Sequence, residues 1–213
     1  IMLMRVILNS ILSFLIYAAL TQGNNAESVF NYEIGARIED KIADFTYLIS
    51  SVLDVSFIKA RKHMVDITDE VNACRHLFYA EKLSYMSEIS NLYVGLEDGT
   101  FYDYSADFTL SQNFSFGRAL YPKDVPVYLL YSVRDDGYPF EHLGNYSYNV
   151  RGRPWYIKSK EIKQQYWTEP YLDAISGDPT ISLIKPLTNH LLNGVQMDFA
   201  GTVCVDVYLT QFN

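Results

Sequence analysis

The side chains best suited to binding a small charged molecule lie close together in residues 148–173, which begin Tyr-Asn-Val-Arg-Gly-Arg-Pro-Trp-Tyr. Pro154 suits the first position of a short helix, where its missing N–H costs no hydrogen bond. Arg153 then stands at the mouth of that helix, and Trp155 and Tyr156 lie in its first turn. The spacing therefore predicts a cation and two aromatic rings around one helix N-terminus.

This combination can bind both ends of a small zwitterion. Free backbone N–H groups and the positive end of the helix dipole favour an anion, and the guanidinium of Arg153 can bind a carboxylate through two parallel hydrogen bonds. Aromatic faces can bind a cation. We therefore expect a pocket for a molecule such as an amino acid.

A carboxylate on the last strand could supply the opposite charge. Residues 199–209 alternate like a strand, with Val203, Val205, Val207 and Leu209 on one face and Thr202, Cys204, Asp206 and Tyr208 on the other. Asp206 thus lies opposite an aliphatic face, towards either water or a polar pocket. If it is buried, it needs a cation or several hydrogen-bond donors.

Structural roles can explain the same residues one at a time. Arg153 could pair with Glu169 or Asp173 as a bridge that stabilises the fold, and Trp155 and Trp167 could belong to the core. Asp173 resembles a turn-capping residue more than a ligand contact, because Gly177 follows closely.

The elements that must position these residues fall into three segments: 1–23, 24–90 and 91–213. Residues 24–63 read as one long helix without proline, with apolar residues at spacings of three and four, and 66–90 as a further helical stretch. From Asn91 onward the pattern changes to strands, with turns at Asp98-Gly99 and Asn193-Gly194. Residues 107–123 read as a polar connection. The sequence predicts an α+β fold, an antiparallel sheet of five to six strands packed on a long N-terminal helix.

The first segment, 1–23, resembles a signal peptide or signal anchor, with one early arginine followed by a mostly apolar run. Either interpretation sends the rest of the chain across a membrane. Two sequons, at Asn113 and Asn145, are consistent with a secreted glycoprotein.

The overall composition excludes several classes of function. Of the 213 residues, 49% are hydrophobic, and the net charge of -8 argues against nucleic-acid binding, which needs clustered Lys and Arg. No motif typical of a hydrolase, a P-loop or a zinc site is present, so we expect no enzyme activity, cofactor or metal. The two cysteines, Cys74 and Cys204, could pair, but small buried hydrophobes are the favoured interpretation.

Taken together, the chain resembles an extracellular Cache sensor domain, most closely the membrane-distal module of the double Cache (dCache) type. The resemblance covers residues 26–213 and rests on ISNLYVGLEDGTFYDY, RGRPWYIKSK, WTEPYLDAISGDPTISLIKPL and AGTVCVDVYL. Such domains have a PAS-like α/β fold. The amino-acid-binding subclass carries a spaced set of residues that this chain matches in Tyr148, Arg153, Trp155, Tyr156, Tyr171 and Asp206.

The resemblance implies roles for these six residues. Those expected at the ligand carboxylate are Tyr148, Arg153 and Trp155, and those expected around its ammonium are Tyr156, Tyr171 and Asp206. It also implies a plasma-membrane receptor with this domain outside the cell or in the periplasm, anchored by the N-terminal segment and able to form a homodimer through the long helix.

Two further expectations follow from the resemblance. A complete double Cache domain continues into a second module, so we expect this chain to be a fragment of a larger receptor or an unusual single-module protein. The alternative function is a Cache-fold ectodomain that binds a protein partner or has a structural role, without a metabolite.

Overall fold

The computed structural model describes residues 25–73, 75–77, 89–107, 113–120 and 127–212. The chain divides into two compact units, Ile1–Ile49 and Ser50–Asn213. The first unit is described only from Asn25 and is helical throughout that part. The predicted segment 1–23 and the cysteine Cys74 lie outside the described residues. No helix in the described ranges has the length and apolar character needed to cross a membrane.

The long helix predicted for 24–63 is confirmed as α2 (Asn25–Arg61). Uninterrupted helical periodicity without proline explains its length. It ends where His63 takes a left-handed conformation at φ 53°. Of the helical stretch predicted for 66–90, residues 70–73 and 75–77 are helical, and 78–88 lie outside the described residues.

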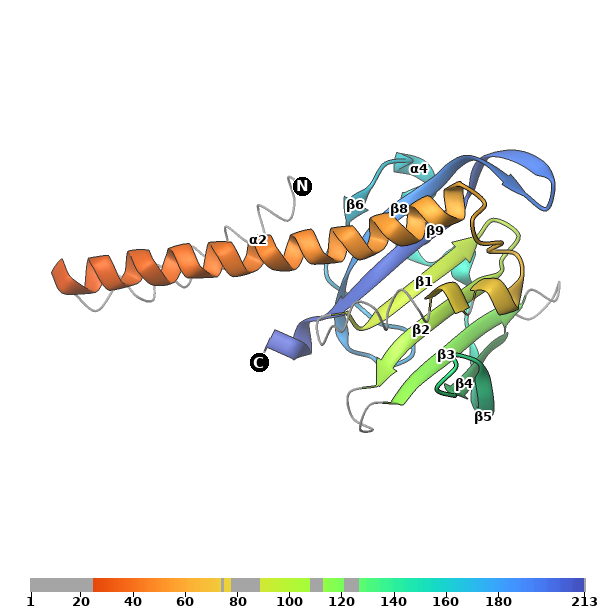
Figure 1. The fold of residues 1–213 in the computed structure, drawn as a ribbon, viewed down its shortest axis with the longest axis horizontal. Helices are drawn as coiled ribbons and strands as arrows, with labels where there is room; N and C mark the ends of the chain where they lie inside the picture. Colours follow the sequence, from red (N-terminus) through yellow and green to blue (C-terminus); the bar gives the residue numbers. More distant parts are fainter. Residues whose placement is uncertain (1–24, 74, 78–88, 108–112, 121–126, 213) are drawn as a thin grey trace. The chain divides into compact units, whose positions relative to one another are not determined.

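The second unit is built on one antiparallel sheet (Figure 1). The strands follow the order β5-β4-β3-β2-β1-β9-β8-β6, with β7 paired to β8. Their bounds are β1 (Asn91–Leu96), β2 (Phe101–Asp107), β3 (Asn113–Leu120), β4 (Val127–Val133), β5 (Pro139–Ser147), β6 (Tyr166–Trp167), β7 (Tyr171–Leu172), β8 (Pro179–Leu192) and β9 (Val195–Tyr208). The short helical segments are η1 (Val150–Gly152), α4 (Pro154–Ile162) and η2 (Leu209–Phe212).

The α+β class is confirmed, but the described residues form a sheet of nine strands rather than the predicted five to six. One of the additional strands is β3, which lies inside the 107–123 segment that the sequence suggested was a polar connection. Its Ser, Gly and Arg residues look polar, yet they pair along their length with β2 and β4. Backbone hydrogen bonds to the strands on either side, rather than hydrophobic side chains, keep this stretch extended.

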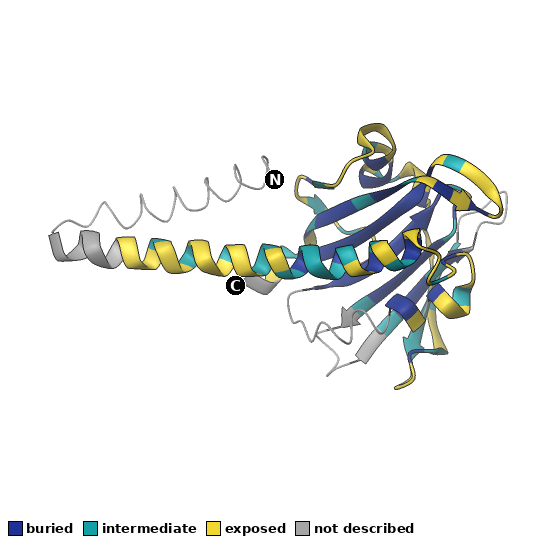
Figure 2. Ribbon diagram, turned by 45° about the horizontal axis from the view of Figure 1, so that its top comes forward, coloured by how far each residue is buried: buried dark blue, intermediate teal, exposed yellow. Residues whose placement is uncertain are grey.

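The sheet separates two layers. On one face the C-terminal part of α2 buries Leu53, Ser56 and Ala60, spaced as one helical stripe, and Ser56 and Ala60 share a small space with Val94 and Val203. On the other face an aromatic cluster packs beneath α4 and η1. Figure 2 shows that the central strands between these layers are buried. Both faces of β9 are therefore covered, and Cys204 is a buried free thiol on the aromatic side.

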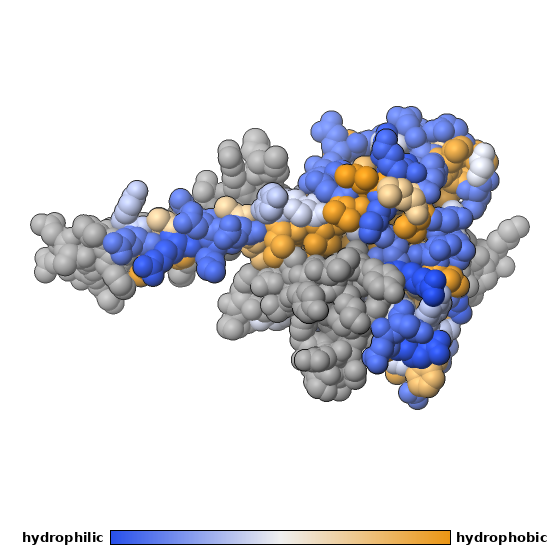
Figure 3. All heavy atoms as spheres, in the orientation of Figure 1, coloured by the Kyte–Doolittle hydropathy of each residue, from blue (hydrophilic) through white to orange (hydrophobic). Residues whose placement is uncertain are grey.

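The turns agree with the glycine and asparagine signals. Asn193 and Gly194 both have positive φ, as a tight hairpin turn between β8 and β9 requires. Asp98 accepts a hydrogen bond from the Thr100 N–H at 3.0 Å, which orders the β1–β2 turn. On the face seen in Figure 3, hydrophilic residues cover most of the described surface of the second unit, with apolar side chains in smaller groups.

Candidate ligand-binding site

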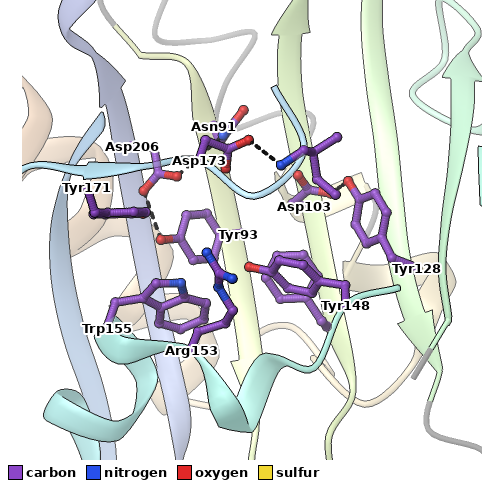
Figure 4. A pocket seen from close by; sticks show the side chains of 12 residues that line it. Asn91, Tyr93, Asp103, Tyr128, Tyr148, Arg153, Trp155, Tyr171, Asp173 and Asp206 are labelled. Atoms are coloured by element: carbon purple, nitrogen blue, oxygen red, sulfur yellow. Dashed lines mark hydrogen bonds between the residues drawn. The ribbon is translucent and has the colours of Figure 1, made fainter. Parts of the chain in front are cut away.

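Arg153 lies at the start of α4, as the sequence predicted, and directly follows η1. It is the N-cap of α4 in an extended conformation, followed by Pro154 in the first turn. Its N–H donates to the Val150 carbonyl at 3.0 Å and so closes η1. Because the backbone is fixed on both sides, the side chain leaves the turn in a defined direction, towards the sheet (Figure 4).

The guanidinium of Arg153 has no protein anion to neutralise it within the described residues. Its Cζ lies 5.4 Å from the centre of the Tyr148 ring, a cation–π arrangement. Its buried Nε has no hydrogen-bond partner. No ion pair joins it to Glu169 or Asp173 in the described part of the chain, so the stabilising bridge considered as an alternative is not formed.

Asp206 is buried on the pocket side of β9, with 3% of its surface exposed. Its Oδ1 accepts hydrogen bonds from Tyr93 Oη at 2.8 Å and from Ser182 Oγ, and Asn91 Nδ2 is 3.4 Å from Oδ2. All three donors are neutral. The carboxylate is therefore oriented by the protein but has no cationic partner among the described residues.

Burial has a clear electrostatic consequence for Asp206. Desolvation raises its pKa to about 7, although the hydrogen bonds from Ser182 and Tyr93 act in the opposite direction. Burial disfavours the ionised form of a carboxyl group, and a nearby cation favours it. A ligand ammonium placed beside Asp206 would stabilise the ionised form.

Three more of the predicted residues form aromatic walls around this space. Tyr148 packs on Phe101 with ring centres 5.1 Å apart, and Trp155 meets the edge of Tyr93 at 5.2 Å. Tyr171, on β7, shares a hydrogen bond of 2.8 Å with Ser182. The Tyr171 hydroxyl thus joins the network that also holds Asp206.

Tyr156 is the one predicted residue that the structure does not bring to the pocket. Its hydroxyl donates to Glu97 Oε2 at 2.9 Å, and its ring packs edge-on against Phe199. Adjacent helical residues point about 100° apart. Trp155 and Tyr156 therefore cannot both face one small site from α4, and Tyr156 supports the pocket from outside.

One cavity brings the opposite charges together (Figure 4). Five of the six predicted residues line it, namely Tyr148, Arg153, Trp155, Tyr171 and Asp206. Among the described residues no cluster of three or more His, Cys, Asp or Glu side chains is arranged to hold a metal ion.

Seven further residues line the same cavity and were not predicted: Asn91, Tyr93, Phe101, Asp103, Tyr128, Asp173 and Ile175. The alternation of β1 could have indicated Tyr93, because it points away from the aliphatic side of that strand. Asp103 carried the same signal as Asp206, a carboxylate in the middle of an apolar strand. The other residues reach the pocket only through strand pairing and loop path.

Asp173 has the turn-capping role that was considered from the sequence. Its Oδ1 accepts from the N–H groups of Ile175 and Ser176, at 2.9 and 2.7 Å. It also lines the cavity, as Ile175 does. The loop after β7 is thus held by the same carboxylate that adds negative charge to the pocket wall.

A family model described as "Methyl-accepting chemotaxis protein-like, first PDC sensor domain" matches residues 80–213. No curated protein matches the chain. The match covers the β-sheet, α4 and every residue of the cavity.

Solved structures with some similarity are ligand-binding domains of chemoreceptors. The domain of Mlp24 with asparagine is 21% identical, with a TM-score of 0.46, over 95% of this chain and 61% of that one. The domain of Pseudomonas fluorescens CtaA in complex with L-leucine is 18% identical, with a TM-score of 0.46, over 79% and 53%. The domain of Campylobacter jejuni Tlp3 in complex with 4-methylisoleucine is 16% identical, with a TM-score of 0.43, over 81% and 53%. The chain thus spans between about half and three fifths of these domains.

Proposed function

Because the chain belongs to the family of methyl-accepting chemotaxis protein-like first PDC sensor domains, we propose that its pocket binds an amino acid or a similar small zwitterion. In this arrangement Arg153 binds the ligand carboxylate and Asp206 binds its ammonium. Tyr148 and Trp155 flank the carboxylate end, and Tyr171 flanks the ammonium end.

The observation that carries this proposal is the pairing of two unneutralised charges of opposite sign in one cavity. Arg153 and Asp206 both line it, and within the described residues neither forms an ion pair. Asp206 is buried and Arg153 is half-buried, and a charge withdrawn from water without a partner is costly. A molecule that carries both signs, with its own charges spaced to meet them, removes both costs at once.

The expected strength of binding is consistent with a sensor. A hydrogen bond to a charged group contributes about 1.5–3 kcal/mol. Two such bonds from Arg153 and one from Asp206 could supply most of the roughly 8 kcal/mol that corresponds to micromolar affinity. The neutral donors around Asp206 are already ordered, so little further ordering opposes binding there.

The receptor context is part of the same proposal. We place the domain outside the cell or in the periplasm as the membrane-distal, double-Cache-type module of a transmembrane receptor. There it acts without catalysis, by coupling ligand binding to a conformational equilibrium of the long helix. Residues 1–23 would anchor or export it, and a second copy could pair with it along α2.

A thermal-shift screen of the purified protein tests the ligand class. The probes are the common L-amino acids, simple amines without a carboxylate and carboxylic acids without an amine. We expect a raised unfolding midpoint with amino acids alone, because only they satisfy both Arg153 and Asp206. A shift with amines but not with amino acids would remove the role given to Arg153.

If no amino acid shifts the midpoint, the proposal fails. The alternative is an ectodomain that binds a protein partner and no metabolite. In that case the unfolding midpoint of Arg153→Ala, measured in the same screen, shows whether Arg153 serves only to stabilise the fold. Loss of stability in that variant without any ligand response would assign Arg153 a structural role.

A further inference from the structure

The pocket holds more negative than positive charge. Among the described residues, its lining includes the carboxylates Asp103, Asp173 and Asp206 but only one cation, Arg153. An amino acid with a neutral side chain carries one charge of each sign, so it would leave this excess unchanged. The chemistry of the lining therefore calls for a ligand with an additional positive charge.

Asp103 is far enough from Asp206 to bind a different part of the ligand. Asp206 pairs with Asn91 across β9 and β1, and Asp103 pairs with Tyr93 across β2 and β1. The two carboxylates are thus on the same face, two strands and two residues apart. With about 4.8 Å between strands and about 3.4 Å per residue, their Cα atoms are roughly 12 Å apart. Figure 4 shows Tyr93 and Arg153 between them.

The position of the Asp103 side chain is fixed by two hydrogen bonds and by a glycine on the neighbouring strand. Tyr128 Oη donates to its Oδ1 at 2.7 Å, and Ser105 Oγ donates to its Oδ2 at 3.0 Å. The neighbouring strand carries Gly117 at this point, where a Cβ would lie 1.8 Å from Tyr128 Oη and 2.1 Å from Asp103 Oδ1. Only glycine leaves space for this pair of side chains.

The donors to Asp103 are neutral groups, so they do not neutralise the charge of its buried carboxylate. Only 6% of Asp103 is exposed, and within the described residues it forms no ion pair. Desolvation raises its pKa to about 6. A carboxylate has about four acceptor sites, more than Tyr128, Ser105 and the Gly117 N–H occupy, so Asp103 can still accept a hydrogen bond from a ligand.

A second unfilled acceptor lies at the other end of the pocket. Asn91 is 5% exposed, and its Nδ2 is directed to Asp206 and Tyr208. Its Oδ1 is buried and has no partner. A buried acceptor in this position requires a donor, which the ligand's α-ammonium beside Asp206 would provide. This leaves Asp103 available for a separate donor.

We propose that the ligand is a basic amino acid whose side-chain ammonium or guanidinium binds Asp103 and Tyr128 while its α-ammonium binds Asp206 and Asn91. This inference rests on the proposed function and narrows its ligand class. Because the two carboxylates leave the same face of the sheet from Cα atoms roughly 12 Å apart, the ligand must hold its two cationic groups several ångströms apart. The extended side chains of ornithine and lysine span such a distance.

Titration calorimetry on the whole chain tests the inference with a matched pair of probes. L-lysine and L-norleucine differ in the terminal ammonium, and L-ornithine is a shorter basic analogue. We expect lysine or ornithine to bind about tenfold or more tightly than norleucine, since one ion pair at a buried site is lost. Asp103→Asn should reduce this preference to less than about threefold, chiefly by weakening the binding of lysine and ornithine.

The control variant is Asp136→Asn, which changes an exposed turn carboxylate and should preserve the preference for lysine. If Asp103→Asn does not fold, Tyr128→Phe removes one hydrogen bond of the subsite and should weaken lysine binding more than norleucine binding. Equal binding of lysine, ornithine and norleucine to the unaltered protein would overturn this inference and leave the amino-acid proposal intact. Failure of every amino acid to bind would overturn both.

Discussion

The hydroxyl of Tyr93 donates a hydrogen bond of 2.8 Å to Oδ1 of Asp206, from the strand next to it in the sheet. Tyr93 also packs against the edge of Trp155. One residue of β1 thus connects the carboxylate on β9 with the aromatic wall on α4. The strand carboxylate and the aromatic turn of α4, which are separate features of the sequence, therefore belong to one site.

Arg153→Ala should weaken amino-acid binding by about tenfold or more, because the ligand carboxylate loses its charge-assisted hydrogen bonds. Arg153→Lys should weaken binding to a similar extent, since an ammonium cannot donate two parallel hydrogen bonds from one plane as a guanidinium does. Calorimetry measures both. Arg151→Ala serves as the control, because Arg151 contacts the Glu97 carbonyl rather than the cavity. Equal losses in the Arg151 and Arg153 variants would contradict the assignment.

Asp206→Asn should also weaken binding by about tenfold or more, because the ligand ammonium would be buried without a counter-charge. The substitution keeps the size of the side chain, so the network around Ser182 and Tyr93 should remain largely in place. Circular dichroism checks the fold, and calorimetry measures affinity. Unchanged affinity in a folded Asp206→Asn protein would exclude the carboxylate from the site.

Ligand binding should become stronger as the pH rises from about 6 to about 8. Burial raises the pKa of Asp206 to about 7, and only the ionised form attracts an ammonium. The ionised fraction grows about tenfold over this range, so affinity should grow by up to about that factor. Tyr93→Phe removes a donor that stabilises the carboxylate and should move the midpoint of this dependence to higher pH. A flat profile in the unaltered protein would contradict this role for Asp206.

The free energy of unfolding of the ligand-free protein should decrease as the pH rises, in contrast to the affinity for the ligand. The folded-state pKa of Asp206 lies above its usual value of 3.8, so the folded state retains a proton that the unfolded state has released. Stability contributed by this group is therefore lost as the pH rises from about 4 to about 7. Asp103 acts in the same direction, with a pKa of about 6.

Thermal melts at several pH values measure this effect as a difference between variants. His76 contributes oppositely, because burial lowers its pKa to about 4 and the unfolded state then binds the extra proton. Subtracting the Asp206→Asn profile from the unaltered one removes the His76 contribution. We expect the difference to favour Asp206→Asn increasingly towards neutral pH. A difference that does not change with pH would show that Asp206 titrates normally.

Gly117→Ala should destabilise the protein by about 1–3 kcal/mol, a typical cost of overpacking. The added Cβ would overlap the Tyr128 hydroxyl and Asp103, and neither can move far within the sheet. Chemical denaturation measures the loss. Gly144→Ala is the matched control on β5, because its Cβ would meet Tyr146 only at an ordinary 3.5 Å. Similar effects at both positions would show that the space beside Gly117 is not needed.

Local sequence signals were sufficient for the helix, most strands and the turns. The absence of proline across α2, the left-handed Asn193 and Gly194, and the alternation around Asp206 all depend on neighbours in the chain. Pro154 likewise marks the start of α4 and so fixes where Arg153 stands. The resemblance of the spaced residues then identified five of the cavity's lining residues.

Only the tertiary structure decided which of these side chains share a cavity. Asn91, Tyr93 and Asp103 join the site through the pairing of β1 with β2 and β9, and the register of β1 with β9 links positions more than 100 residues apart. Tyr156 does not line the cavity, because successive side chains of a helix point about 100° apart and Trp155 already faces the cavity. A sequence fixes the direction of a side chain relative to its own strand or helix. Which charges meet depends on how those elements pack, and here that packing leaves Arg153 and Asp206 facing one space with no counter-ion from the described protein.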